Sequence, residues 1–176
     1  DELNQFLDND PTKISWTAKL KQKLLANTAI EFSDAKITSA NYRPFCRQVF
    51  YLDRNLIERP GKTPEFFPAG HENYMICVSG KSNTKELSVF ISDRLTDLHF
   101  NGDTQCFPLY YYDQIDNAEA TLFDAEKTHT VRRDGVTDFI LAQARGLYGD
   151  RVTKEDIFYY VYAFLITVTT LVEDAC

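Results

Sequence analysis

Apolar residues along the chain follow two spacings, one typical of helices and one typical of strands. Between Ile14 and Leu25 apolar side chains interleave with lysines, which predicts a basic amphipathic helix. Thr12 or Ser15 is its expected N-cap and Asn27 is its expected end. We therefore expect the first helix of the chain to present a basic surface.

The C-terminal part of the chain predicts two further helices. Residues 137–147 gather apolar side chains on one side and end near Gly149, a residue type common after helix C-termini. The sequence Thr-Lys-Glu-Asp at 153–156 resembles a capping box and precedes the aromatic run 157–165. We expect these aromatic side chains to pack in the core, and stacking on unpaired bases is the alternative.

Short runs rich in β-branched and aromatic residues predict strands in the middle of the chain. The polar segment 80–86 separates two of these runs and indicates a hairpin with an extended loop, and residues 101–103 are a turn signal. The polar, acidic segment 113–134 predicts a surface excursion. The expected strands occupy residues 46–53, 74–79, 87–92, 95–100 and 105–112.

Together these elements predict an α+β fold. Its mostly antiparallel or mixed sheet has about five strands, with the N-terminal basic helix and the two C-terminal helices packed against it. The chain has 176 residues, of which 44% are hydrophobic, and this is enough for the core of one domain. We expect a polar lead-in or linker remnant at 1–12, a domain at 13–165, and an atypical tail, truncated or altered in reading frame, at 166–176.

The composition favours a cytoplasmic protein. No apolar run approaches the length of about 18 residues that a membrane helix needs, and the chain opens with acidic rather than basic and apolar residues. Its four cysteines are far apart and form no Cys-x-x-Cys pair. We therefore expect reduced structural thiols and neither a zinc site nor a disulfide framework.

The net charge of -7 hides a gradient along the sequence. Residues 13–62 contain ten basic and four acidic residues, a net of +6, whereas residues 1–12 carry -4 and residues 63–176 carry -9. Duplex DNA binding depends on phosphate neutralisation by Lys and Arg, so only the basic third of the chain suits it. Ordinary charge scatter on a solvated surface is the alternative interpretation.

Fragments of catalytic motifs occur, but each lacks a required residue. Gly61-Lys62 and Gly80-Lys81 resemble phosphate-binding loops, yet the upstream glycine is replaced by Leu56 and Met75 respectively. His71-Glu72 lacks the second histidine of a zinc-protease helix, and no methyltransferase loop of the Asn-Pro-Pro-Tyr type is present. We therefore predict no catalytic residue, no metal site and no cofactor in this chain.

Several longer blocks carry a resemblance to a known family. The blocks are Asn-Tyr-Arg-Pro-Phe at 41–45, Val-Phe-Tyr-Leu-Asp-Arg at 49–54, Asn-Leu-Ile-Glu-Arg at 55–59, Phe-Ile-Ser-Asp-Arg-Leu-Thr-Asp-Leu-His at 90–99, Cys-Phe-Pro-Leu-Tyr at 106–110 and Glu-Asp-Ile-Phe-Tyr-Tyr-Val-Tyr at 155–162. In their order and spacing they are similar to the C-terminal specificity domain of type ISP restriction-modification enzymes over residues 14–165, and the segment 166–176 departs from that pattern.

The resemblance implies a role within a larger polypeptide. Such enzymes join a nuclease, an ATP-driven helicase-like translocase, an adenine methyltransferase and a target-recognition domain. This chain would be the last part, a monomeric fragment that is not itself an enzyme and that binds double-stranded DNA beside the upstream methyltransferase and helicase domains. ATP, Mg²⁺ and S-adenosylmethionine are implied as cofactors of the parent protein only.

In such a domain Lys and Arg bind phosphates, while Arg, Asn and Gln contact base edges. Arg43 and Arg54 have an alternative role, which is to brace the fold through an ion pair or a stacked ring. The candidate DNA contacts are Arg43, Arg47, Arg54, Arg59 and Lys62 in the basic third, and Lys81, Ser82, Asn83 and Lys85 in the loop between two predicted strands.

Two other functions stay open at this point. The chain is an interdomain scaffold without base readout if its acidic face binds the other domains of the parent protein. It is an unrecognised enzyme if the fold assembles a pocket of convergent carboxylates or a histidine pair. Both remain less favoured than DNA recognition, because the motif blocks match a specificity domain and the catalytic motifs are incomplete.

Overall fold

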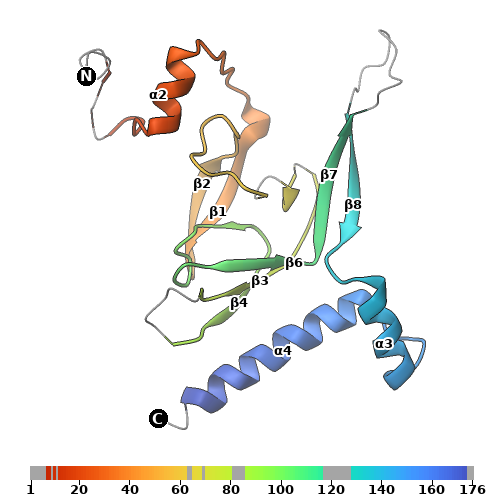
Figure 1. The fold of residues 1–176 in the computed structure, drawn as a ribbon. Coiled ribbons are helices and arrows are strands. Elements are labelled where there is room, and N and C mark those ends of the chain that lie inside the picture. Colours follow the sequence, from red (N-terminus) through yellow and green to blue (C-terminus); the bar gives the residue numbers. More distant parts are fainter. Residues whose placement is uncertain are drawn as a thin grey trace.

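A computed structural model gives the fold of the chain (Figure 1) and describes residues 7, 8, 10, 12–62, 65–68, 70–80, 86–116 and 128–173. Helices and short strands combine as expected for an α+β fold. The helices are α2 (Ala18–Leu25), the short 3-10 turn η1 (Asp34–Lys36), α3 (Asp138–Tyr148) and α4 (Lys154–Glu173). The strands are β1 (Ile37–Arg43), β2 (Cys46–Tyr51), β3 (Met75–Val78), β4 (Val89–Ser92), β5 (Leu95–Thr96), β6 (Gln105–Pro108), β7 (Tyr110–Asp116) and β8 (Thr128–Asp134).

The strands form three small sheets, with the orders β2-β1-β5, β4-β3-β6 and β7-β8. All pairings are antiparallel except that of β1 with β5, which is parallel. The expected single sheet of about five strands is thus divided, because the strand expected at 95–100 ends at Thr96 in a turn and the one expected at 105–112 is interrupted at Leu109.

Two strands lie where the sequence predicted none. β1 pairs with β2 from Ile37 opposite Tyr51 onward, and β8 pairs with β7 over seven residues within the segment expected to be a surface excursion. The segment expected to be a surface excursion is therefore regular strand at residues 113–116 and 128–134, and residues 132–134 are exposed. β8 is polar, and its cations bind the neighbouring strand, since Arg132 lies 4.3 Å from the Tyr110 ring centroid and Arg133 pairs with Asp113.

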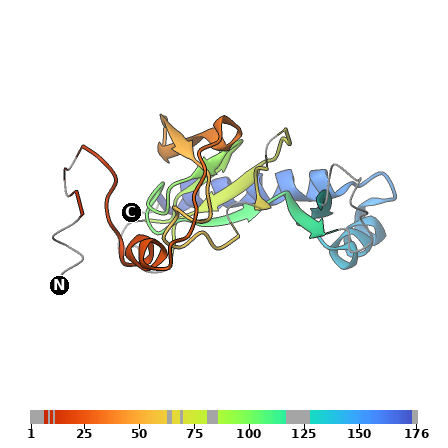
Figure 2. The ribbon, with the colours of Figure 1, turned by 90° about the horizontal axis from the view of Figure 1, so that it is seen from above.

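The core lies on both faces of β3, the central strand of its sheet. Met75 and Cys77 point to one face and pack with Phe100, while Ile76 points to the other and packs with Phe158 of α4. Both views show α4 running along this sheet (Figures 1 and 2), and α3 contacts α4 at the far end. The aromatic run of α4 therefore supplies core side chains on one of its faces.

Local hydrogen bonds fix the helix ends. Thr17 caps α2, in place of the expected Thr12 or Ser15, and Thr137 caps α3. The predicted capping box at the start of α4 is confirmed, because the Asp156 N–H donates to Thr153 Oγ1 at 3.1 Å and the Thr153 N–H donates to Asp156 Oδ2 at 2.9 Å. α4 continues without a break into the segment expected to be an atypical tail.

Three other expectations concern sites and spans. Cys46, Cys77 and Cys106 are free thiols in the structure. Within the described ranges, no three metal-ligating side chains gather into a cluster, and no helix combines the length and apolar character that a membrane span requires.

The buried side chain of Asn73 joins three segments that are distant in sequence. Its Nδ2 donates to the carbonyl oxygens of Phe66 and Tyr110 at 2.8 and 2.7 Å. Its Oδ1 accepts the N–H groups of Tyr74 and Tyr110 at 2.8 and 3.1 Å. This amide therefore holds the loop before β3, the start of β3 and the start of β7 in one place.

We expect Asn73→Asp to destabilise the fold, because a carboxylate would face two carbonyl oxygens without donating to either. Leaving buried polar groups unsatisfied costs about 1–3 kcal/mol each, so we expect a loss of about 2–5 kcal/mol in the free energy of unfolding. Urea unfolding followed by circular dichroism measures it. Gln105→Glu makes the same chemical change at an exposed site and is the control. Equal stabilities of the two variants would contradict the assigned role of Asn73.

Candidate nucleic-acid interface

The hairpin of β1 and β2 projects its tip beside the end of β5. Arg43 pairs with Cys46 at the end of the hairpin, so Pro44 and Phe45 form the turn. Proline suits the first turn position because its φ is fixed near the required value. Phe45 has a φ of 66°, in the left-handed region that favours glycine. The tip thus presents a phenyl ring, and in sequence Arg43 precedes it by two residues and Arg47 follows it by two.

Arg43 braces this hairpin. Its Nη1 donates to Asp97 Oδ1 at 2.8 Å and to the Tyr42 carbonyl oxygen at 2.6 Å, and its Cζ lies 4.0 Å from the centroid of the Tyr42 ring. These contacts connect the hairpin to the turn after β5. Of the two roles open for Arg43 from the sequence, the geometry fits the structural one.

Arg47 of β2 pairs across the hairpin with Asn41 of β1 and is exposed. Asn41 is engaged internally, since its Nδ2 donates to Ser92 Oγ at 2.9 Å. The field of Arg47 contributes to holding the pKa of Asp93 below its ordinary value, after the larger effect of the hydrogen bond from Arg94. Within the described part of the chain, the side chain of Arg47 makes no hydrogen bond and no ion pair, so its guanidinium is available to an anion.

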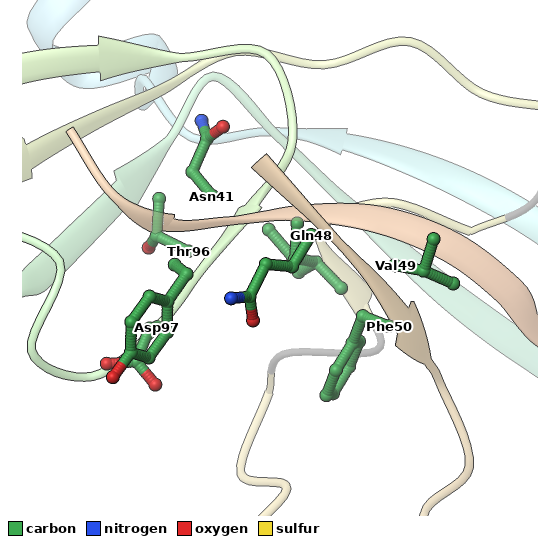
Figure 3. Close-up of a pocket in the computed structure, with 9 residues that line it drawn as sticks. Asn41, Gln48, Val49, Phe50, Thr96 and Asp97 are labelled. Atoms are coloured by element: carbon green, nitrogen blue, oxygen red, sulfur yellow. The ribbon is translucent and has the colours of Figure 1, made fainter. Parts of the chain in front are cut away.

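A pocket of about 190 Å³ opens beside the hairpin (Figure 3). Gln48 and Phe50 line it from the same face of β2, and Thr96 and Asp97 line it from the end of β5. Gln48 is exposed and its amide carries donors and an acceptor. The sequence analysis did not include Gln48 among the candidate contacts. Adjacent residues of a strand point to opposite faces, so the prediction of Arg47 on one face of β2 could have drawn attention to Gln48 on the other.

The loop after β2 is held by Asp53, whose side chain is buried. Lys36 Nζ donates to Asp53 Oδ2 at 2.7 Å, and the Asn55 N–H donates to Asp53 Oδ1 at 2.7 Å. Burial alone would raise the pKa of Asp53, but these two hydrogen bonds together with the positive charges of Lys36 and Lys23 outweigh it and hold the pKa below the ordinary value. The loop therefore has a fixed conformation at its start.

The basic helix α2 supports the same loop. Lys19 Nζ donates to the Ile57 carbonyl oxygen at 3.0 Å, and Lys23 Nζ donates to Asn55 Oδ1 at 2.7 Å. In both contacts the acceptor is an uncharged oxygen, so neither contact neutralises the charge of the lysine. The helix thus adds positive charge beside the loop that carries Arg54 and Arg59.

The other predicted contacts of the basic third lie along this loop. Arg54 is exposed and its Nη2 lies 3.4 Å from Glu65 Oε1. Arg59 is exposed, and among the described residues nothing accepts from its guanidinium. Lys62 is exposed and its Nζ lies 5.5 Å from the centroid of the Tyr111 ring.

The structure therefore places the predicted residues in two groups. Arg43 and Arg47 flank the hairpin tip, while Arg54, Arg59 and Lys62 follow the opposite end of β2, about 15 Å away by the rise of an extended strand. The predicted contacts Lys81, Ser82, Asn83 and Lys85 lie outside the described residues.

With this geometry established, comparison with protein families matches residues 1–168 to the type ISP C-terminal specificity domain. The chain belongs to this family. The match confirms the resemblance stated for residues 14–165 and extends beyond it at both ends. A comparison with curated proteins finds no match.

Solved structures similar to this type ISP specificity domain include a cryo-EM structure of a DrdV–DNA complex. It has a TM-score of 0.74 and 28% identity over 93% of this chain and 15% of the other. The ATP-dependent type ISP restriction-modification enzyme LlaBIII bound to DNA has a TM-score of 0.69 and 26% identity over 94% of this chain and 11% of the other.

A nuclease-deletion mutant of the type ISP restriction-modification enzyme LlaGI, in complex with a DNA substrate mimic, has a TM-score of 0.68 and 28% identity. That alignment covers 93% of this chain and 11% of the other. The type ISP specificity domain described here thus spans less than a sixth of the length of these structural relatives.

The anchoring of the basic loop predicts a pH-dependent effect of Asp53→Asn. Because the pKa of Asp53 is lowered in the folded state, its stabilising effect is present above the unfolded pKa of about 3.9 and is lost as the pH falls through the folded value. At neutral pH we expect the variant to lose about 1–3 kcal/mol of unfolding free energy. Urea titrations at neutral and strongly acidic pH measure this loss.

The same titrations on Asp34→Asn, an exposed carboxylate of η1, give the control. The difference between wild type and Asp53→Asn should shrink at acidic pH, where the wild-type carboxyl is protonated. A difference that is the same at both pH values would show that the charge of Asp53 is not what holds the loop.

Proposed function

We propose that this chain reads the target sequence of double-stranded DNA as the specificity domain of a type ISP restriction-modification enzyme. The observation that carries the proposal is the set of exposed cations on the β1–β2 hairpin and on the anchored loop after β2, in a chain whose family is that of type ISP specificity domains. The three solved relatives all contain DNA or a DNA substrate mimic, which supports the same partner here.

The loop and the hairpin supply the phosphate contacts in this proposal. Arg47, Arg59 and Lys62 are exposed and form no ion pair with a described carboxylate, so binding a phosphate does not require breaking a salt bridge. Arg54 has only a long contact to Glu65 and can exchange it. Contacts of this kind set the position of a protein on the duplex and give binding a strong dependence on salt.

Base reading falls to the hairpin and the adjacent pocket. A two-stranded ribbon fits the major groove of B-DNA, and an amide side chain recognises adenine by a donor and an acceptor together. Gln48 carries such an amide on the pocket face of β2. Arg43 holds the hairpin at its proper angle through Asp97, so it positions the reading side chains without touching DNA.

The rest of the enzyme supplies the chemistry in this proposal. The domain would direct adenine methylation and ATP-dependent translocation and cleavage by upstream domains of the same polypeptide, which bind ATP, Mg²⁺ and S-adenosylmethionine. The specificity domain would act as a monomeric unit of that polypeptide in the cytoplasm. Its own contribution is selection of the site, without a catalytic step.

A second role, as an interdomain scaffold, is favoured by the apolar surface of the C-terminal helices. A groove of about 700 Å³ between α3 and α4 is lined by Ile140, Leu147, Tyr148, Ile157 and Tyr160. Leu147 and Tyr148 are each 77% exposed, which is unusual for apolar side chains grouped on one surface. Contact with other domains of the longer polypeptide would cover this groove and is compatible with DNA reading elsewhere on the domain.

Removal of the free cations tests the DNA proposal. The variant with Arg47→Ala, Arg59→Ala and Lys62→Ala should bind a labelled duplex more weakly at every salt concentration. Its slope of log affinity against log salt should fall by about 1 for each phosphate that the protein no longer neutralises. Fluorescence anisotropy over a salt series measures both quantities.

Arg151→Ala is the matched control, because Arg151 is exposed at the turn between α3 and α4, at the end of the molecule away from the hairpin. Its affinity and slope should equal those of the wild type. A wild-type chain that binds no duplex at low salt would contradict DNA reading and leave the scaffold as the better explanation.

A further inference from the structure

The tip of the β1–β2 hairpin exposes an aromatic side chain on an unfavourable backbone conformation. The side chain of Phe45 is 100% exposed, and its φ is 66°. At the second central position of such a turn, glycine or asparagine adopts a positive φ at the lowest cost. Phenylalanine at this position adopts a backbone conformation that it disfavours, and it gains almost no burial in return. The stability of the folded domain therefore does not explain why a phenylalanine occupies the turn.

Packing within the chain offers Phe45 little. Its ring meets the Phe90 ring edge-on, with centroids 6.4 Å apart, but its surface stays accessible to water. Phe90 has its own core partner in Phe100, at 5.5 Å between centroids. The Phe45 ring is therefore accessible to a binding partner.

The hairpin that carries this ring is anchored to the rest of the domain. Arg43, directly before the turn, is held by Asp97 and by the Tyr42 ring. Farther along β1, Ser39 Oγ accepts a hydrogen bond from Arg94 Nη1 at 2.8 Å. Because β1 is tied to the segment around β5 at Ser39 and at Arg43, the backbone of the hairpin tip is anchored.

The chemical surroundings of the tip suit a nucleic acid. Arg47, two residues beyond Phe45, is exposed and keeps its charge for a phosphate. An apolar ring beside a free cation is the combination with which proteins enter a base step while holding the adjacent backbone. A protein surface would instead call for a wider apolar patch around the ring, and Arg47 interrupts it.

We propose that Phe45 is a wedge that stacks between bases of duplex DNA at a step where the stacking is opened. The inference rests on the proposed DNA-reading function and adds to it a contact that depends on base stacking and not on charge. It requires a duplex whose bases are partly separated, so a duplex with a missing base should be a better ligand than an intact one. The free-energy cost of separating the bases is lowest where a base is missing.

Binding of the 176-residue chain to two duplexes tests the wedge. The duplexes have the same sequence, and one contains a single abasic site. The wild type should prefer the abasic duplex by on the order of tenfold, which is the scale of one base stacked on an aromatic ring. Phe45→Gly should bind both duplexes with the same affinity, while Phe45→Trp should keep the preference.

Thermal unfolding of the same variants separates the wedge from a packing role. Glycine adopts a positive φ without strain, so Phe45→Gly should melt at or above the wild-type temperature. Leu171→Ala removes an exposed apolar side chain of α4, outside the hairpin and its pocket, and is the control, with an unchanged preference for the abasic duplex.

Four results would overturn the wedge. A Phe45→Gly variant that still prefers the abasic duplex would show that the ring does not stack there. A large fall in its melting temperature would assign Phe45 to packing against Phe90. A wild-type chain that binds both duplexes equally well would remove the wedge and keep DNA binding, whereas one that binds neither would remove the proposed function as well.

Discussion

The fully satisfied amide of Asn73 is the interaction on which the arrangement of the domain depends. Its four hydrogen bonds meet at the junction of the loop before β3, the central strand β3 and the β7–β8 ribbon. Tyr112 Oη adds a bond to the Glu72 carbonyl oxygen at 2.8 Å beside it. Because short sheets have limited stability by themselves, this junction helps to join the β4-β3-β6 sheet and the β7–β8 ribbon into one core.

Two ion pairs help to attach the candidate interface to this core, beside the β1–β5 pairing and the Asn41–Ser92 hydrogen bond. Arg43 with Asp97 holds the hairpin, and Lys36 with Asp53 holds the basic loop. Of these four side chains only that of Asp53 is buried. The positive third of the chain thereby divides into cations that brace the fold and cations that stay exposed, and this division gives the interface both a fixed shape and a positive charge.

The sequence predicted what depends on neighbouring residues. The capping box at Thr153, the apolar side of residues 137–147 before Gly149, and the apolar runs of β3 and β4 are local signals, and each produced the expected element. β1 and β8 were not predicted because both are polar and form only by pairing with another strand.

The candidate site shows the same limit. The basic third identified Arg47, Arg59 and Lys62 as exposed cations, but the Asp97 partner of Arg43 lies far along the sequence and no local pattern signals it. The positive φ of Phe45 depends on the closure of the hairpin, and the pocket face of Gln48 depends on the register of β1 with β2. Such features depend on how separate segments pair in the folded chain, so they can be found only in the three-dimensional structure.

Our central claim is that this domain reads a sequence and does not merely bind charge. Selection of duplexes from a random-sequence pool by the isolated chain, followed by sequencing, tests it most directly. We expect enrichment of one short common sequence at moderate salt, where non-specific phosphate contacts are weak. Retention of the pool without a common sequence would contradict sequence reading.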